Sequence, residues 1–457
     1  MNTFSYGAHS SAIAPGTKIL FASLAADGHF NPLTGLALHL KEQGCDVRWY
    51  VGNAYADKLR KLNIPHLPHQ KAIDITVENI NEFFPERTAI KSGIARLKFD
   101  LTHFFIKRGP DFYTDLKAIH QHFPFELMVA DILFTGIPYV KEKMNIPVVG
   151  IGIIPIAETS KDLPPMGLGM TPDTSLFGRI KQKAIRFIAD AVLLRTPSKL
   201  LDTILAEEGM RRDGNLFDTM YRKSTVVLQS GTSGFEYKRS DLNKKIRFVG
   251  PLLPASTKSK TLWSHPKLQQ YKKVILVTQG TAEPDVEKLI VPTLEAFRNT
   301  AHLVIVTTAG NKTAELRQRF PHHNIIIEDF IPFADVMPFA DVYVSNGGYG
   351  GVMLGIRSRL PMVVAGVNEG KNEICARVGH FGLGINLKTE TPKPAKLKKA
   401  VETVLADGSY KAAVAMLCNE FNQYNPAQLC EQEVARLLHA RKPLRMAVRI
   451  SEHAEIY

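Results

Sequence analysis

Two polar residues, His29 and Asp131, stand where apolar segments of the chain end and could together move a proton. His29 lies in the turn at residues 28–32, directly after the apolar segment 18–23, and an imidazole with an ordinary pKa near ~6.5 can take up a proton at physiological pH. Asp131 closes the apolar segment 126–131, and a carboxylate behind an imidazole fixes its tautomer. We therefore predict His29 as a catalytic base oriented by Asp131. A histidine that only hydrogen-bonds its loop and an aspartate that caps a helix are the competing interpretations.

A glycine-rich turn at residues 345–351 is the second candidate for chemistry. Its glycines let backbone N–H groups approach an anion closely, and the N-terminus of the helix expected after it adds a favourable dipole. A second small-residue turn, at Gly280 and Thr281, is placed to contact the far side of a diphosphate. We therefore predict a phosphate-binding cradle, although a tight strand-to-helix turn also requires small residues. The predicted cradle residues are Asn346, Gly347, Gly348, Gly350 and Gly351.

Other sequence signatures of catalysis are absent. No Asp-x-Asp pair occurs, so carboxylates holding Mg²⁺ on a diphosphate are not indicated, and Gly-x-Ser-x-Gly and His-Glu-x-x-His are also missing. The four cysteines show no Cys-x-x-Cys spacing, which argues against structural zinc or a disulfide framework and suits a reducing compartment. We therefore predict a cytoplasmic protein that uses no metal and no cofactor.

The composition is that of a globular chain with a basic surface. Its 457 residues, 45% of them hydrophobic, are enough for two domains or three, and no apolar run reaches the ~18 residues of a membrane-spanning helix. The formal charge of +13 is compatible with nucleic acid, an anionic membrane surface or a phosphate-bearing substrate. Because the basic residues are dispersed and no aromatic-interleaved basic stripe occurs, we expect a solvated basic surface and no nucleic-acid partner.

The order of apolar segments predicts two α/β domains. A strand at residues 18–23, a helix capped by Asn31 with Pro32 at its first position, and a strand at residues 47–51 make a βαβ unit. The pattern restarts with a strand at residues 273–278, followed by strands at 302–307, 324–328, 341–345, 361–365 and 383–387. We expect two doubly wound Rossmann-like domains facing a central cleft, where the carboxyl ends of strands bind ligands. The predicted segments are a flexible arm at residues 1–16, a first domain at 17–250, a linker at 251–272, a second domain at 273–425, a C-terminal helix at 426–440 docking on the first domain, and a tail at 441–457.

Taken in order along the chain, these motifs resemble those of the nucleotide-sugar glycosyltransferases of family 1, which have the GT-B architecture. The resemblance covers roughly residues 18–438 and includes the Gly-His-x-x-Pro turn at 28–32, the Gly-Thr turn, an aromatic-apolar-Pro segment at 330–332 and the glycine-rich loop. It implies a bacterial-type enzyme acting on small lipophilic acceptors, with inversion and without metal. It also implies that His29 is the base, that Asp131 orients it, that Ile331 lies beside the nucleobase, and that the first domain binds the acceptor and the second the donor.

Three departures from the family pattern bear on the donor. Asn346 stands where many members have histidine, and an asparagine can still donate a hydrogen bond to phosphate. Leu354 stands where many members have the glutamate that holds both ribose hydroxyls, and Glu369-Gly370-Lys371 replaces the usual Asp-Gln pair beside the sugar. A hydroxyl facing leucine loses its partner, whereas a deoxyribose has no such hydroxyl. We therefore predict a dTDP-deoxysugar, rhamnose first, with UDP-glucose as the alternative, and we predict Glu369 and Lys371 as donor contacts.

The acceptor site is expected in the N-terminal half, where aromatic residues of loops and helices could line a flat apolar pocket. Such a pocket suits a phenol, such as a flavonoid, or a macrolide, although each of these residues is more often plain core. Two other functions stay open: a peripheral-membrane transferase acting on a glycolipid, for which the sequence offers no strong amphipathic membrane helix, and a degenerate protein that only binds nucleotide. The sequence makes no prediction of oligomeric state. The predicted pocket residues are Phe83, Phe84, Phe104, Phe105, Phe134 and Pro155.

Overall fold

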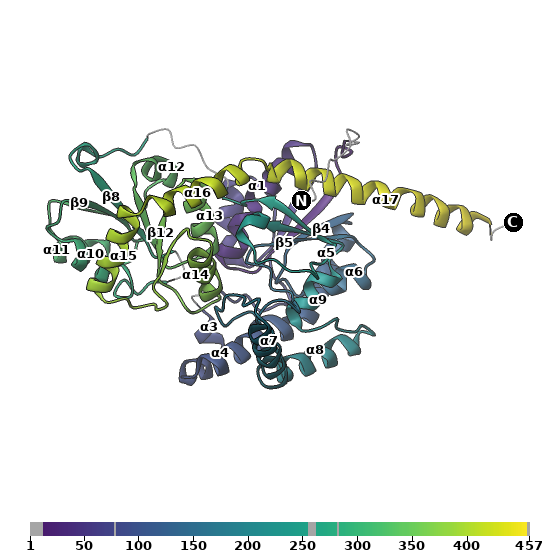
Figure 1. Ribbon diagram of the computed structural model, residues 1–457. Helices are drawn as coiled ribbons and strands as arrows, with labels where there is room; N and C mark the ends of the chain where they lie inside the picture. Colours follow the sequence, from purple (N-terminus) through teal and green to yellow (C-terminus); the bar gives the residue numbers. More distant parts are fainter. Residues whose placement is uncertain (1–11, 77–78, 255–261, 281–282, 455–457) are drawn as a thin grey trace.

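Two parallel β-sheets, one in each half of the chain, form the frame of the molecule (Figure 1). The computed structural model describes residues 12–76, 79–254, 262–280 and 283–454. Within these ranges a seven-stranded sheet is followed along the chain by a six-stranded sheet, and the paired strands of both are parallel. The prediction of two doubly wound α/β domains is therefore confirmed.

In the first sheet the strand order reverses between β1 and β4, since the order is β3-β2-β1-β4-β5-β6-β7. Parallel strands need crossover helices, which cover both faces of the sheet, so the strands are apolar throughout. Alternate residues of β1 enter two separate cores, Leu20 and Ala22 on one face and Ile19 and Phe21 on the other. The strands are β1 (Lys18–Ala22), β2 (Asp46–Tyr50), β3 (His66–Leu67), β4 (Leu127–Asp131), β5 (Val148–Gly152), β6 (Val226–Ser230) and β7 (Ile246–Gly250).

The second sheet repeats this winding, with the order β10-β9-β8-β11-β12-β13 and a reversal between β8 and β11. Doubly wound sheets bind ligands outside the carboxyl ends of their strands at such a reversal. The topology therefore selects the loops after β1 and β4 in the first domain and after β8 and β11 in the second. The strands are β8 (Lys273–Thr278), β9 (His302–Thr307), β10 (Ile325–Glu328), β11 (Val342–Ser345), β12 (Met362–Val364) and β13 (Gly384–Asn386).

Helices cover the sheets and complete the cores on their faces. The apolar face of the first helix is buried at Leu33, Ala37 and Leu40. The helices of the first domain are α1 (Asp27–Glu42), α2 (Ala56–Lys61), α3 (Ile80–Phe83), α4 (Gly93–Asp100), α5 (Gly109–His122), α6 (Ile137–Glu142), α7 (Leu176–Ile188), α8 (Arg195–Glu207) and α9 (Leu216–Lys223). Those that follow are α10 (Ile290–Phe297), α11 (Thr313–Arg319), α12 (Phe333–Val336), α13 (Tyr349–Arg357), α14 (Lys371–His380), α15 (Pro394–Ala406), α16 (Gly408–Phe421) and α17 (Pro426–Ala454).

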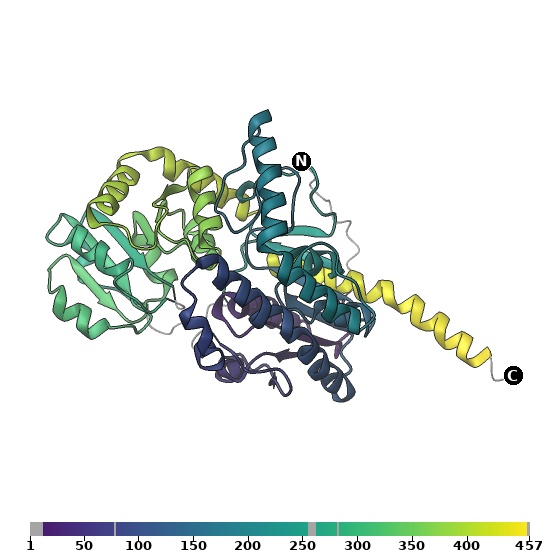
Figure 2. The same ribbon diagram turned by 90° about the horizontal axis from the view of Figure 1, so that it is seen from below.

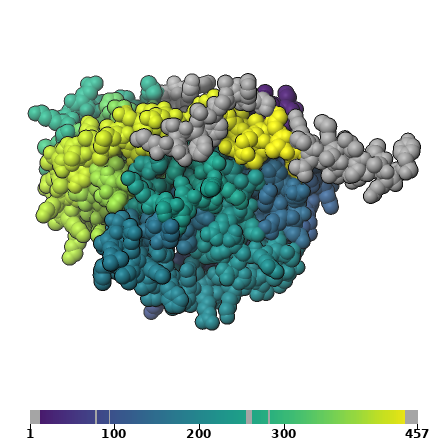
Figure 3. Space-filling model, turned by 45° about the vertical axis from the view of Figure 1, so that its right-hand side comes forward, coloured from purple at the N-terminus to yellow at the C-terminus, as the bar shows by residue number. Residues whose placement is uncertain are grey.

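The last helix, α17, returns from the second domain to the first. Cys430, Val434 and Leu437 belong to the core on one face of the first sheet, and His39 of α1 places Nε2 2.7 Å from a carboxylate oxygen of Glu431. In Figure 3 the yellow surface of α17 lies against the blue and teal surface of the first domain. The helix continues past residue 440, where the sequence predicted its end, to Ala454.

Helix α1 begins earlier than the sequence predicts. Asn31 and Pro32 were expected at its cap and first position, but the helix starts at Asp27 and Pro32 lies inside it. The Ala26 carbonyl accepts the first N–H bonds of the helix, and the Asp27 carboxylate accepts a hydrogen bond from the hydroxyl of Tyr55 at 2.9 Å. The Tyr55 contact comes from 28 residues further along the chain, so the local Asn-Pro signal was outweighed. As a result, His29 lies on the first turn of α1 rather than in a loop.

Part of the predicted linker packs on the second domain. Of residues 251–272, the structure describes 251–254 and 262–272. Trp263, Leu268 and Tyr271 contact the core of the second domain, and the backbone N–H of Trp263 donates to Asp335 Oδ2 at 2.9 Å.

The three strands β3, β6 and β7 had no counterpart among the predicted strands.

Helix α7 is amphipathic, but unlike a helix that packs on a core it exposes its apolar face and buries part of its polar face. Its apolar side chains face solvent, and its buried residues are Gly178 and Gln182. We expected no strong amphipathic membrane helix from the sequence, and this segment had not been singled out. Among the described residues, no helix combines the length and apolar character needed to cross a bilayer.

A buried histidine in the first domain, His69, makes no hydrogen bond from either ring nitrogen within the described part of the chain. Its ring packs on Tyr50 and Phe112, with centroid distances of 4.9 and 5.7 Å. The Asp74 carboxylate lies 3.7 Å from Nδ1, which is beyond hydrogen-bond reach. Burial, and next the nearby Arg108 guanidinium, lower the pKa of His69 to about 4.

Acid is therefore expected to destabilise the fold through His69. Below the ordinary pKa of 6.5 the unfolded chain binds a proton here that the folded chain does not bind until about pH 4, so stability is lost as the pH falls through this window. The loss amounts to up to about 3 kcal/mol. Urea unfolding at several pH values should show this slope diminished in His69→Gln and kept in a variant at an exposed histidine, His122→Gln. An unchanged slope in His69→Gln contradicts the assignment.

Candidate active site

The two residues predicted to move a proton lie in contact. Nδ1 of His29 is 3.1 Å from Oδ1 of Asp131. Asp131 is fully buried, whereas the His29 side chain is 18% exposed, so the imidazole still reaches solvent. The pair stands at the reversal of strand order in the first sheet, because His29 follows β1 and Asp131 ends β4.

Backbone groups hold the Asp131 carboxylate in place. The N–H of Leu24 donates to Oδ2 and the N–H of Leu133 donates to Oδ1, each at 2.9 Å. A buried carboxylate needs such donors to offset the loss of water. Asp131 therefore accepts hydrogen bonds from two turns and contacts His29 at the same time. Neither Leu24 nor Leu133 belongs to a helix, so these bonds are not those of a helix cap.

This geometry prepares the imidazole to accept a proton at Nε2. When the hydrogen on Nδ1 is donated to Asp131, the free lone pair of the neutral ring is on Nε2. A hydroxyl within reach of Nε2 can give up its proton as its oxygen attacks, and the carboxylate stabilises the imidazolium that forms. His29 and Asp131 can thus act as a general-base dyad.

The glycine-rich loop joins β11 to α13 at the reversal of the second sheet. Gly347 has a φ of +77°, which favours glycine, and a Cβ there would lie 2.2 Å from Cys375 Sγ. Gly348 caps α13. Apart from its chain neighbours and the backbone of its own helix, no described heavy atom lies within 4 Å of where a Cβ on Gly350 would stand. Gly351 follows in the first turn of the helix. The first turn of α13 therefore presents backbone N–H groups beside open space, which suits an anion.

Asn346 ties this loop to the turn after β8. Its side-chain amide donates a hydrogen bond to the carbonyl of Gln279, and its Oδ1 accepts the N–H of Gly348 at 3.3 Å. Gly280, with a φ of +77°, is close enough that a Cβ there would lie 3.3 Å from Asn346 Nδ2. Two separately predicted parts of the cradle therefore meet. Thr281 lies outside the described residues.

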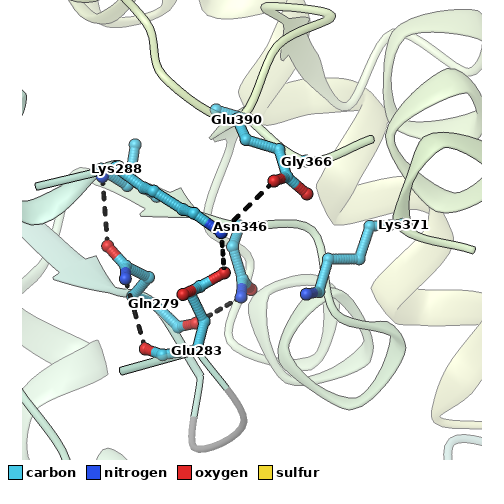
Figure 4. A pocket seen from close by; sticks show the side chains of 9 residues that line it. Gln279, Glu283, Lys288, Asn346, Gly366, Lys371 and Glu390 are labelled. Carbon is cyan, nitrogen blue, oxygen red and sulfur yellow. Dashed lines mark hydrogen bonds and ion pairs between the residues drawn. The ribbon is translucent and has the colours of Figure 1, made fainter. Parts of the chain in front are cut away.

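A pocket beside Asn346 contains charged residues that the sequence did not indicate (Figure 4). Lys288 Nζ pairs with the carboxylates of Glu283 and Glu390. Burial lowers the pKa of Lys288, but these two carboxylates more than offset it, so the pKa is raised. Of the lining residues, Asn346 and Lys371 were predicted from the sequence, and Gln279 precedes the predicted Gly-Thr turn. The lining residues are Gln279, Glu283, Lys288, Leu289, Asn346, Ala365, Gly366, Lys371 and Glu390.

Lys371 lines the same pocket from the start of α14 (Figure 4). Its Nζ lies 2.6 Å from a carboxylate oxygen of Glu369, whose side chain is exposed. The N–H of Lys371 donates to the carbonyl of Asn368 at 2.9 Å, and Glu369 and Gly370 have φ values of +55° and +77°. Two successive positive φ values define a turn that favours glycine in its second central position. This turn aims the lysine into the pocket.

The segment predicted beside the nucleobase is split between core and surface. Ile331 is buried in the core of the second domain, whereas Phe330 next to it is exposed. Across the two domains, α1 contacts α13, and the hydroxyl of Tyr349 on α13 donates to the Ser230 carbonyl of the first domain at 2.7 Å. His29 on α1 and the glycine-rich loop that leads into α13 therefore belong to helices that touch one another.

Part of the predicted acceptor set forms an aromatic cluster on and after α3. Phe83 is exposed. Phe84 packs against Phe99 and His103, with centroid distances of 5.7 and 5.3 Å. Phe99 and His103 stack at 4.3 Å, and no sequence motif had marked them. Burial, and next Lys107, lower the pKa of His103.

The remaining predicted acceptor residues lie deeper. Phe104 is buried and contacts Phe105, which is partly buried, at a centroid distance of 5.0 Å. Phe134 is fully buried and packs 4.7 Å from Phe112, so its side chain serves the core. Pro155 is buried as well.

No group of three or more His, Cys, Asp or Glu side chains is arranged to share an ion among the residues that the structure describes. All four cysteines are buried free thiols. A reaction without a metal stays a prediction.

Comparison with known proteins agrees with the geometry. A family model described as "Erythromycin biosynthesis protein CIII-like, C-terminal domain" matches residues 292–440. 4'-Demethylrebeccamycin synthase of Lentzea aerocolonigenes is 32% identical over 410 residues, covering 89% of this chain and 96% of that protein. UDP-glucosyltransferase 1 of Beauveria bassiana (strain ARSEF 2860) is 28% identical over 444 residues, covering 92% and 95%. The crystal structure of the glycotransferase of kitacinnamycin matches with a TM-score of 0.72 at 18% identity, covering 93% of this chain and 100% of that one.

The class of protein follows from the fold and from these relatives. The two facing parallel-sheet domains are a GT-B architecture, as in the matching glycosyltransferase structures. The chain belongs to the UDP-glycosyltransferase-like family, glycosyltransferase family 1, and is a glycosyltransferase that uses a nucleotide-sugar donor. The predicted family, fold and enzyme class are confirmed, and the alternative of a non-catalytic nucleotide binder is set aside.

Proposed function

We propose that this enzyme transfers a deoxysugar, with dTDP-rhamnose as the donor, to a hydroxyl of a small aromatic or lipophilic acceptor such as a flavonoid or a macrolide. Transfer proceeds with inversion and without a metal. The first domain holds the acceptor and the second holds the donor. The observation that carries the donor assignment is Leu354, eight residues after Asn346 on α13.

The mechanism assigned to the site uses the dyad and the cradle together. His29 Nε2 takes the proton of the acceptor hydroxyl while the oxygen of that hydroxyl attacks the anomeric carbon of the donor sugar. The bond from that carbon to the diphosphate breaks on the opposite face. Backbone N–H groups at Gly348, Gly350 and Gly351 and the dipole of α13 stabilise the charge of the departing diphosphate.

Leu354 argues for a deoxyribose nucleotide. Its side chain is apolar and packs against the core of the second domain, so it offers no acceptor to a ribose 2′-hydroxyl. Burying a hydroxyl against leucine costs the hydrogen bonds that water provided, whereas a 2′-deoxyribose loses nothing. Lys371, which lines the pocket with Asn346, supplies a charge for the diphosphate or for sugar hydroxyls.

Calorimetric titration without added metal is expected to show tighter binding of dTDP than of UDP. In Leu354→Glu the ratio should move toward UDP by about tenfold or more, because a hydrogen bond to a charged acceptor contributes ~1.5–3 kcal/mol. Leu354→Met keeps the volume without adding an acceptor and should leave the ratio unchanged. An unchanged ratio in Leu354→Glu would show that this residue does not select between the two nucleotides.

The alternative donor is UDP-glucose. The relative from Beauveria bassiana is named a UDP-glucosyltransferase, which favours this donor. Equal or better binding of UDP by the unmodified protein would put UDP-glucose first and leave the dyad and the cradle in their proposed roles.

A further inference from the structure

Helix α7 exposes an apolar face that no described part of the chain covers. Within its sequence LFGRIKQKAIRFI, the large apolar residues recur at helical spacing. Their side chains are 57–78% exposed, although an amphipathic helix normally buries this face. The exposed residues are Leu176, Phe177, Ile180, Phe187 and Ile188.

Hydrogen bonds on the opposite face fix this orientation. Gln182 is buried, and its Nε2 donates to the carbonyls of Asp173 and Gly178 at 2.7 and 3.1 Å. The Arg186 guanidinium donates to the carbonyl of Leu163 and, at 2.9 Å, to that of Lys161. Turning the apolar face inward would break these bonds and leave buried polar groups without partners. These hydrogen bonds therefore stabilise the fold with the apolar face of α7 directed toward solvent.

The charges of α7 indicate the kind of surface that its apolar face would contact. The helix carries four basic residues and no acidic one. Arg179, Lys181 and Lys183 are exposed. Helical geometry places Arg179 and Lys183 along one border of the apolar face and Lys181 along the other. An apolar stripe between basic borders is the pattern of a helix that lies in the surface of an anionic bilayer.

We propose that α7 docks this enzyme on an anionic lipid surface, with the apolar side chains in the acyl boundary and the basic residues at the headgroups. A second copy fits less well, because pairing two α7 faces would bring like charges together without any acidic partner on the helix. A nucleic acid would meet the charges but leave the apolar side chains in water. The position of α7 also favours docking, since Figure 1 places it with α4 and α8 on the lower side of the molecule, which Figure 2 views directly.

The test is sedimentation of the full-length protein with vesicles. Vesicles of phosphatidylcholine alone are compared with vesicles in which about a third of the lipid is phosphatidylglycerol. We expect binding to the anionic vesicles more than about tenfold tighter than to the neutral ones, and weaker binding as salt rises from about 0.1 to about 1 M. Equal binding to both vesicle types, or none to the anionic ones, overturns the proposal.

Two pairs of variants separate α7 from the rest of the basic surface. Phe177→Ser with Phe187→Ser, and Arg179→Glu with Lys183→Glu, should each lower anionic-vesicle binding more than about tenfold. The matched controls are Phe339→Ser for an exposed aromatic ring and Lys399→Glu with Lys411→Glu for exposed charges; all three residues lie in the second domain. These controls should bind as the unmodified protein does. Binding that survives in both α7 variants places the lipid contact elsewhere and overturns the proposal.

Light scattering after gel filtration tests the competing occupant. A dimer that dissociates in Phe177→Ser with Phe187→Ser would assign the apolar face to a second copy and also overturn the proposal. Unchanged unfolding curves establish that the variants remain folded, which is expected because the substituted side chains face solvent. The vesicle result does not depend on the donor or the acceptor, so its failure is distinguishable from failure of the proposed function.

Discussion

His29→Ala is expected to lower kcat/KM for sugar transfer by about 10³-fold while leaving the affinity for the nucleoside diphosphate nearly unchanged. The base takes part only in proton removal, and no step of nucleotide binding uses it. The diphosphate is instead proposed to contact the glycine loop of α13, which belongs to the other domain. Steady-state kinetics and calorimetry on the same variant measure the two quantities separately.

A matched control lies on the same helix. His39 is also on α1, but its imidazole contacts Glu431 of α17 instead of Asp131. His39→Ala should therefore keep most of its turnover. Asp131→Asn should lose much of the activity and alter its pH profile, because the amide no longer enforces the tautomer that frees Nε2. Substantial turnover in His29→Ala would contradict the assignment of the base.

Most of the frame of the site was predictable because its signals are local. A parallel strand buried on both faces leaves an uninterrupted apolar run, and each of the strands β1, β4, β8 and β11 is followed by a residue or turn that the sequence had singled out. The order of the strands then brings these four loops to two reversals, which accounts for the meeting of His29 with Asp131 and of Asn346 with the Gly280 turn.

The parts that escaped prediction depend on contacts between distant segments. Glu390 enters the pocket beside Asn346 from far along the chain to reach Lys288, and neither residue stands in a motif. Helix α7 has a periodic apolar pattern, but periodicity does not say which face a helix buries. The start of α1 was misplaced for the same reason, since Tyr55 and Lys58 hold Asp27 from outside the local sequence.

The contact between the two domains depends on a buried charge cluster of this long-range kind. Arg377 of α14 is 2% exposed, and its Nη2 donates to Glu236 of the first domain at 3.0 Å. Its Nη1 lies 3.3 Å from a carboxylate oxygen of Glu373. Burial lowers the pKa of Arg377, but Glu236 and its neighbours more than offset this and raise it.

Both carboxylates of the cluster are also bound by backbone groups of the first domain. The other oxygen of Glu236 accepts the N–H of Ile156 at 2.9 Å. Glu373, on the second domain, accepts the N–H groups of Gly167 and Gly169 at 2.9 and 2.8 Å. Glu236 thus reaches from the first domain to the second, and Glu373 from the second to the first. Because the guanidinium of Arg377 compensates the charge of both, its removal affects both sides of the junction.

Arg377→Met is expected to destabilise the protein by about 3–5 kcal/mol, because it leaves two buried carboxylates without a counter-charge. Adding Glu236→Gln and Glu373→Gln should recover most of this loss, since the triple variant buries no uncompensated charge. Denaturant unfolding measures both, and Arg317→Met is the matched control, because its pair with Glu328 is solvent-exposed and should matter by less than about 1 kcal/mol. A loss in Arg377→Met as small as in the control would mean that water already compensates the carboxylates at the junction. A loss that the triple variant does not recover would mean that Arg377 stabilises the junction by packing on Tyr237, whose ring centre lies 4.2 Å from its guanidinium carbon, rather than by its charge.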